Sequence, residues 1–254
     1  MAGGPHEGAP DILEGQFRLL SEAYDFDPPP RVSGRYMIAS TPRSGSTMLS
    51  MRLWRTGRLG APLEYFNFAN VMPKLQLRFG STSLDAYMRM LARARTSPNG
   101  VFGFKAHWTH IQFMLIAGLW TTLRPERIVR VRRRDRLAQA VSLTIATQTG
   151  RFSSLDGESD DLVYDPAQIQ ASWDYIERSE AAWDGFLEPC GADLREVDYD
   201  DLREMDDVAF KALAEFLSPD AMDGPTLELP AVRSQSSARN AEWVERFRTE
   251  EGGE

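Results

Sequence analysis

A loop of small and hydroxyl-bearing residues stands between an apolar run and a helical pattern near the start of the chain. Its sequence is Thr41-Pro42-Arg43-Ser44-Gly45-Ser46-Thr47, and the apolar run 36–39 precedes it. Backbone N–H groups at the start of a helix lack partners within the helix and carry partial positive charge, so they bind anions. Arg43 adds a forked cation to this set. The segment therefore predicts an anion site, although an ordinary strand–turn–helix junction fits it equally well.

The loop differs from a nucleoside-triphosphate loop at two positions. The pattern G-x-x-x-x-G-K-[ST] would require a glycine at Ser40 and a lysine at Ser46. The loop is P-loop-like, but its pattern does not favour a nucleoside triphosphate.

Further polar residues follow a second apolar run, 101–104. Lys105 comes directly after it, and only three of the 29 basic residues of the chain are lysines. His107 follows, and a histidine titrates near neutral pH, which suits the role of a general base. His107 and His110 suggest a metal pair, but no third ligand stands at a suitable spacing, so we expect no metal.

Alternating elements must position these side chains. The segments that predict strands are the apolar runs 36–39 and 101–104, together with 127–132 and 196–199. The helical patterns cover 12–24, 48–55, 84–96, 111–120, 136–148, 169–187, 205–217 and 240–249, with Asp135 as the cap of the helix over 136–148. Such alternation predicts an α/β, P-loop-like three-layer fold with a central parallel sheet flanked by helices. We expect one domain over 31–254, after a flexible or partly helical segment 1–30.

Composition argues against several other classes of protein. A net charge of −8 disfavours a general nucleic-acid binder. Cys190 is the single cysteine, so no intrachain disulfide can form. The longest apolar stretch, 113–120, is far shorter than the roughly 20 residues of a membrane helix. The N-terminus lacks the pattern of a signal peptide. We therefore expect a soluble, cytoplasmic protein with no integral membrane segment and no nucleic-acid partner.

The loop and several later segments resemble one enzyme family. Ser40–Thr47 is similar to the 5′-phosphosulfate loop of the bacterial trehalose 2-sulfotransferase-like family of PAPS-dependent sulfotransferases. Segments that agree in the same order are Gly60–Phe66, Asn99–Lys105, Gln139–Ser142 and Glu242–Phe247. The resemblance covers about residues 35–250. It implies PAPS (3′-phosphoadenylyl sulfate) as co-substrate, no metal, and a homodimer.

The resemblance also implies which residues bind the nucleotide. The loop from Thr41 to Thr47 would hold the phosphosulfate. Arg133, at the end of a predicted strand, and Ser142, on the following helix, would hold the 3′-phosphate. Gln235 aligns with a glutamine that would contact the nucleotide. The chain departs from the family at Ala138, where relatives often have a second serine.

The catalytic groups implied by the resemblance leave one choice open. Arg43, Lys105 and the loop amides would stabilise the transferred group and the leaving oxygen. Glu64 matches the glutamate proposed as the base in this family. His107 competes with it, because Lys105-Ala106-His107 is similar to the segment that carries the base in the eukaryotic cytosolic sulfotransferases.

The expected function is therefore transfer of a sulfuryl group to a hydroxyl of a carbohydrate, glycolipid or other small-molecule acceptor. One alternative is a P-loop-like small-molecule kinase, against which the missing lysine counts. The other is a catalytically silent anion-binding protein of the same fold. The sequence does not identify the acceptor. Its pocket would come from the segments 65–83 and 149–166, which we expect to be loops.

Overall fold

The centre of the molecule is a sheet of parallel strands. The structure, a computed structural model, describes residues 20–26, 31–150, 162–228 and 238–251. The strands pair in the order β2-β1-β3-β4, and every pairing is parallel. Their bounds are Val101–Ala106 for β2, Gly34–Ser40 for β1, Arg127–Arg132 for β3 and Asp193–Asp198 for β4. The predicted α/β fold with a central parallel sheet is confirmed.

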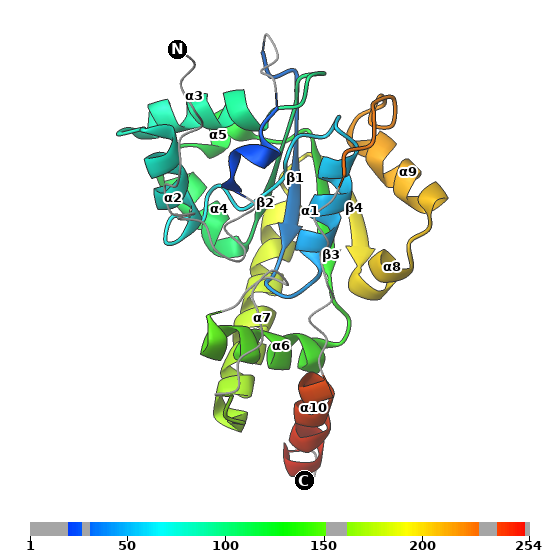
Figure 1. Ribbon diagram of the computed structural model, residues 1–254. Helices are drawn as coiled ribbons and strands as arrows, with labels where there is room; N and C mark the ends of the chain where they lie inside the picture. Colours follow the sequence, from blue (N-terminus) through cyan, green and yellow to red (C-terminus); the bar gives the residue numbers. More distant parts are fainter. Residues whose placement is uncertain (1–19, 27–30, 151–161, 229–237, 252–254) are drawn as a thin grey trace, which may run out of the picture.

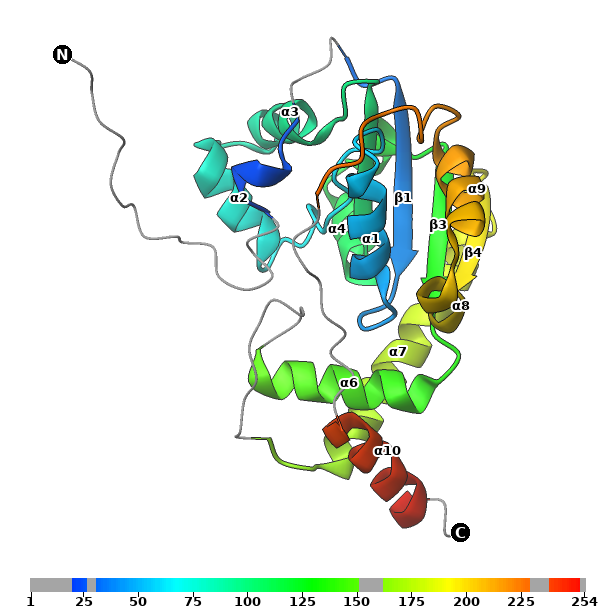
Figure 2. The same cartoon turned by 45° about the vertical axis from the view of Figure 1, so that its right-hand side comes forward.

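Helices cover both faces of this sheet. One face packs against α1 (Ser46–Arg55), α8 (Tyr199–Glu204) and α9 (Asp207–Leu217). The other packs against α3 (Leu84–Arg95), α4 (Trp108–Ile116) and the C-terminal part of α7 (Pro166–Leu187), with α2 (Val71–Phe79) and α5 (Trp120–Leu123) outside them. Figures 1 and 2 show these three layers from two sides.

The alternation of side chains along β1 explains the two buried faces. Met37 and Ala39 belong to one apolar cluster, and Tyr36 and Ile38 belong to the other. All four side chains are fully buried, as expected for a strand inside a parallel sheet with helices on both sides.

A third apolar cluster lies beyond the carboxyl edge of the sheet. It joins α6 (Arg136–Thr149), α10 (Ala238–Glu251) and the N-terminal half of α7. Along α7, Ile169 and Ile176 belong to this cluster, whereas Trp183 and Leu187 pack against the sheet. The helix α7 therefore connects the two regions.

Several elements agree with the sequence-based expectation. The strand over 127–132 is found with the predicted bounds, and the side chain of Asp135 caps α6 by accepting the Ala138 N–H at 2.9 Å. The predicted helix over 240–249 corresponds to α10. Of the helix predicted over 12–24, the described part is a 3₁₀ turn at Glu22–Tyr24.

Three predictions of local structure were wrong. The helix expected over 111–120 is α4 followed by α5, because Gly118 adopts a left-handed φ of 69° between them. The segment 65–83, expected to be a loop, contains α2, whose Pro73 stands in the first turn, where a proline is tolerated. The strand expected over 196–199 is β4, which begins at Asp193 and ends at Asp198, because Asp198 caps the unpredicted helix α8.

Candidate active site

The predicted site residues meet at the carboxyl edge of the sheet. The loop 41–45 follows β1, His107 follows β2 and Arg133 follows β3. The strand β1 lies between β2 and β3, so the chain leaves β1 for one neighbour and then returns to the other side. In open parallel sheets, ligands bind at such a switch point, outside the carboxyl ends of the strands.

The loop after β1 has an unusual backbone. Arg43 has a φ of 64°, and it is the one non-glycine residue with a positive φ in the described part of the chain. Such a conformation costs about 1–3 kcal/mol and is found mostly at functional sites. Gly45 has a φ of 85°, and a Cβ atom there would lie 2.5 Å from Cδ2 of Tyr199. A side chain at position 45 therefore has no room.

Four consecutive amides of this loop point to an anion. Among the residues that the structure describes, the backbone N–H groups of Ser44, Gly45, Ser46 and Thr47 have no hydrogen-bond acceptor. They stand at the N-terminus of α1, whose N-cap is Gly45. Unpaired amides at a helix start form a positive site that suits phosphate or sulfate.

Lys105 links this loop to Glu64. Its Nζ donates to Oγ1 of Thr47 at 2.8 Å and lies 2.9 Å from Oε1 of Glu64. The side chain of Lys105 is 4% exposed and that of Glu64 is 21% exposed. Glu64 reaches this position because Leu63 forms a parallel bridge with Phe104 of β2, which places position 64 beside position 105.

His107 has an acceptor on each side of its ring. Nδ1 lies 3.0 Å from the carbonyl oxygen of Ser40, and Nε2 lies 3.3 Å from Oε1 of Glu64. Nδ1 also lies 3.2 Å from Oγ of Ser40, a hydroxyl that can donate or accept. The Glu64 carboxylate only accepts, so Nε2 forms a hydrogen bond with it when that nitrogen carries a proton. The structure thus brings Glu64, Lys105 and His107 together.

The charges in this group set two pKa values. Burial raises the pKa of Glu64, but Lys105 and His107 outweigh this effect and hold it well below 4.5. Burial, together with the charge of His107, lowers the pKa of His110 to about 3. His110 is therefore neutral at pH 7, and its Nδ1 accepts the backbone N–H of His107 at 3.1 Å. Within the described residues, no three His, Cys, Asp or Glu side chains form a metal-binding group.

A second cationic group lies directly beside the loop. Nε of Arg43 donates to Oγ of Ser142 at 2.9 Å, and Nη1 of Arg133 donates to the backbone oxygen of Arg43 at 3.4 Å. The guanidinium of Arg133 lies 4.6 Å from the ring centre of Tyr199. The residues predicted for two phosphates are thus in contact. Gln235 lies outside the described residues.

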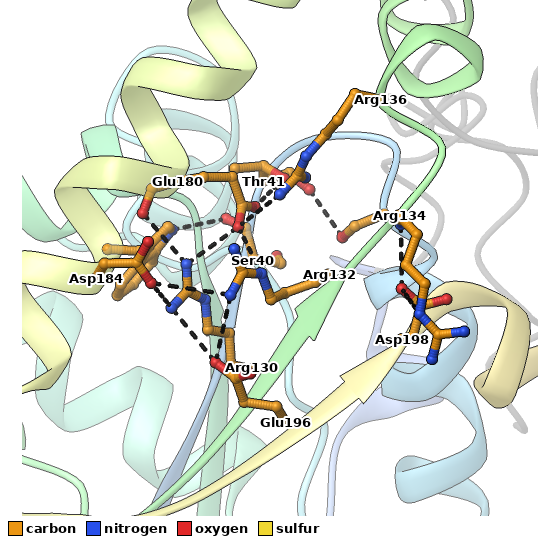
Figure 3. Close-up of polar contacts among 12 residues, drawn as sticks. Ser40, Thr41, Arg130, Arg132, Arg134, Arg136, Glu180, Asp184, Glu196 and Asp198 are labelled. Carbon is orange, nitrogen blue, oxygen red and sulfur yellow. Dashed lines mark hydrogen bonds and ion pairs between the residues drawn. The ribbon is translucent and has the colours of Figure 1, made fainter.

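Sequence reasoning missed two buried residues that hold the loop. The Thr41 hydroxyl donates to Oε1 of Glu180 on α7 at 2.9 Å and accepts from Nε2 of Gln139 on α6 at 2.8 Å. Figure 3 shows Thr41 and Glu180 in this network. A signal for Glu180 existed, because it interrupts the apolar stripe formed by Ile176 and Trp183.

Comparison with known proteins identifies the family of the chain. The family model of the Stf0 sulphotransferases matches residues 35–250. The chain belongs to the Stf0 sulphotransferase family. Its resemblance to the trehalose enzymes is confirmed, and the protein is a member of a family of sulfotransferases.

Two proteins that are similar in sequence to this chain are trehalose 2-sulfotransferases. That of Mycobacterium tuberculosis (strain Erdman) is 25% identical over 256 residues, which cover 85% of this chain and 94% of the relative. That of Mycolicibacterium smegmatis is 24% identical over 254 residues, with coverage of 84% and 94%. Among solved structures, the sulfotransferase domain of the Synechococcus PCC 7002 olefin synthase aligns with a TM-score of 0.42 and 14% identity, over 87% of this chain and 97% of that one.

Among the helices that the structure describes in this Stf0 family member, none combines the length and the apolar character that crossing a bilayer requires.

Proposed function

We propose that this protein transfers a sulfuryl group from PAPS to a hydroxyl group of a small-molecule acceptor. The observation that carries the proposal is the contact between two cationic groups: Arg43, in the loop with unpaired amides, donates to Ser142, beside Arg133. Two adjacent anion sites suit a nucleotide with a phosphate at each end of its ribose. The 5′-phosphosulfate would lie in the loop, and the 3′-phosphate would lie at Arg133 and Ser142.

The donor site would use backbone and side-chain groups together. The amides from Ser44 to Thr47 would bind the phosphosulfate oxygens, and Pro42 and Gly45 would shape the loop around them. A bidentate guanidinium at Arg133 suits a phosphate, and Ser142 would add a hydroxyl. A contact from Gln235 to the nucleotide stays a prediction.

The transfer step needs charge stabilisation on the leaving group. The acceptor oxygen forms a bond to sulfur while the bond from sulfur to the 5′-phosphate oxygen breaks, so negative charge grows on that phosphate oxygen. Lys105 and Arg43 are the cations beside the loop that would neutralise it. Such preorganised groups contribute most when they act away from water, and the Lys105 side chain is 4% exposed.

We propose Glu64 as the base that accepts the proton of the acceptor hydroxyl. Its Oε1 faces Lys105 and His107, whereas Oε2 has a single contact within the described residues, with Nδ2 of Asn67 at 3.3 Å. A low pKa weakens a base. However, Lys105 also contacts Thr47, so an anion bound in the loop would partly compensate the positive charge of Lys105. The pKa of the Glu64 carboxyl would then rise.

His107 would then orient the base. Its Nδ1 is held by Ser40, and its Nε2 faces Glu64 rather than open solvent. The open choice between the two residues is tested by Glu64→Gln and His107→Ala. We expect Glu64→Gln to nearly abolish turnover with little change in nucleotide affinity, and His107→Ala to leave a measurable residual rate. Full activity in both variants would contradict the assignment.

The acceptor is proposed as a sugar hydroxyl, in a carbohydrate, a glycolipid or another small molecule. Support comes from the curated relatives, whose names give trehalose as their acceptor. At 25% identity, this support extends to the class of acceptor and not to trehalose itself.

One experiment tests the proposed function directly. The intact protein is titrated by calorimetry with the desulfonated product PAP (adenosine 3′,5′-bisphosphate). It is then incubated with radiolabelled PAPS and an extract of the source organism, with mass spectrometry of the labelled product. We expect saturable PAP binding that Arg43→Ala and Arg133→Ala weaken, and a labelled sulfate ester. An intact protein that does not bind PAP would refute the proposal.

A further inference from the structure

The carboxylate of Glu180 connects the loop to three arginines. Its Oε1 accepts the Thr41 hydroxyl at 2.9 Å. Its Oε2 lies 3.0 Å from Nη2 of Arg130, 3.1 Å from Nε of Arg132 and 3.3 Å from Nη2 of Arg136. The side chain of Glu180 is 4% exposed, and Figure 3 shows it among the labelled arginines.

These contacts close into a ring through Gln139. Nη1 of Arg136 donates to Oε1 of Gln139 at 3.2 Å, and Nε2 of Gln139 donates to the Thr41 hydroxyl and to the Pro42 carbonyl, both at 2.8 Å. The ring thus runs from Glu180 through Thr41, Gln139 and Arg136 back to Glu180. It ties the loop after β1 to both α6 and α7.

The bonds among Thr41, Gln139 and Glu180 matter most, because these three residues of the ring are buried. Thr41 and Gln139 are fully buried. A buried polar group that loses its partner bears the full cost of desolvation, and neighbouring hydrogen bonds polarise one another. The Thr41 hydroxyl both donates to Glu180 and accepts from Gln139. It therefore contributes to the loop by fixing its position.

The ring connects the loop and the helix that carry the two anion sites of the proposed function. On one side is the loop, in which Thr41 and Pro42 precede the residues with unpaired amides. On the other side is α6, which carries Ser142 three residues after Gln139 and follows Arg133. The relative position of loop and helix fixes the distance between the groups for the 5′-phosphosulfate and those for the 3′-phosphate.

We propose that Glu180 is a positioning residue that sets the spacing between the two phosphate sites, and so selects nucleotides with both phosphates over those with one. This inference rests on the proposed function. In a ligand with two anionic groups, the second group adds affinity only when the two sites stand at the right separation. Binding of the second group is then an intramolecular event. A nucleotide with one phosphate gains nothing from the spacing.

The test compares three nucleotides on one variant. Glu180→Gln keeps the shape and a hydrogen-bonding oxygen but removes the charge that holds three arginines. Calorimetry is done with PAP, adenosine 5′-monophosphate and adenosine 3′-monophosphate. We expect the affinity for PAP to fall about tenfold to a hundredfold, the range for a lost hydrogen bond to a charged group. The affinities for the two monophosphates should change by less than about threefold, because neither depends on the spacing.

Glu177→Gln is the matched control. Glu177 lies on the same helix, its side chain is 51% exposed, and its contact is with Nε of Arg136 at 3.4 Å. We expect this variant to bind PAP like the intact protein. An equal loss for all three nucleotides in Glu180→Gln, or no loss, would overturn the inference. An intact protein that does not bind PAP would instead refute the proposed function.

Urea denaturation would reveal whether Glu180→Gln folds. If it does not fold, a second pair of variants tests the same inference. Thr41→Val removes the ring hydroxyl with little change of shape, and Thr41→Ser restores it. We expect the same selective loss of PAP affinity in Thr41→Val and its recovery in Thr41→Ser. Should Thr41→Val bind PAP as tightly as the intact protein, the ring does not set the spacing.

Discussion

The amino group of Lys105 lies 2.9 Å from Oε1 of Glu64 and only 2.8 Å from the hydroxyl oxygen of Thr47. One buried cation is therefore shared between the carboxylate proposed as the base and the last residue of the proposed phosphosulfate loop. Because a single charge serves both partners, a change at either one alters the electrostatics of the other.

Lys105→Met tests the role of this cation in turnover. The substitution keeps the apolar stem and removes the charge that would stabilise the leaving phosphate oxygen. We expect kcat to fall about a hundredfold or more, the usual effect of losing one preorganised donor to the transition state. Steady-state kinetics with saturating PAPS would measure it. Lys211→Met is the control, since Lys211 is exposed and its ion pair among the described residues is with Glu215 at 3.6 Å. Unchanged turnover in Lys105→Met would exclude a catalytic role for the lysine.

Glu64→Gln tests the pH dependence of stability. The pKa of Glu64 is held well below 4.5 in the folded protein. Its charge therefore stabilises the fold at pH values above the unfolded pKa, and this contribution is lost as the pH falls through the folded pKa. At pH 7 we expect the variant to be less stable by about 3 kcal/mol, since it leaves the buried Lys105 without its carboxylate. The gap should shrink below about pH 4.5.

Urea denaturation across a pH series would measure this gap. Glu188→Gln, at an exposed glutamate at the end of α7, should show little difference from the intact protein at any pH. A gap between Glu64→Gln and the intact protein that stayed constant down to pH 3 would show that the carboxylate is not the source of the stabilisation.

Much of the site could be predicted from the order of elements. The loop at 41–47, Lys105 and Arg133 each follow an apolar run, and the carboxyl ends of parallel strands share one edge. The sequence therefore implied that these groups converge. The helix over 71–79 was missed because Pro73 normally disfavours a helix interior, and its place in the first turn cannot be read from composition.

Two parts of the site depend on contacts between distant segments. Glu64 reaches Lys105 because Leu63 bridges Phe104, and Gly60 lets the chain pass closely, since a Cβ atom there would lie 2.7 Å from the carbonyl of Arg95. No local pattern encodes this bridge. Glu180 interrupts an apolar stripe on α7, but its partners come from other elements, which periodicity alone does not identify.

Arg133→Ala tests the 3′-phosphate site. The substitution removes the guanidinium that lies beside Arg43 and over the ring of Tyr199. We expect PAP affinity to fall about tenfold or more, the effect of a lost hydrogen bond to a charged group, and the affinity for adenosine 5′-monophosphate to stay nearly unchanged. The neighbouring Arg134→Ala is the control, because the side chain of Arg134 is 69% exposed and pairs with Asp201 at 2.7 Å. Equal losses for both nucleotides would place Arg133 elsewhere in the site.

Arg43 allows the strain of the loop to be separated from its charge. Its φ of 64° suits glycine and strains any residue with a side chain. Arg43→Gly and Arg43→Ala both remove the guanidinium, but only glycine also removes the strain. We expect Arg43→Gly to be more stable than Arg43→Ala by about 1 kcal/mol in urea denaturation. Both should lose PAP affinity to a similar extent in calorimetry, because both lack the cation that contacts Ser142. Equal stability of the two variants would mean that the loop relaxes to a negative φ, and the left-handed turn would then not be needed to aim the amides from Ser44 to Thr47.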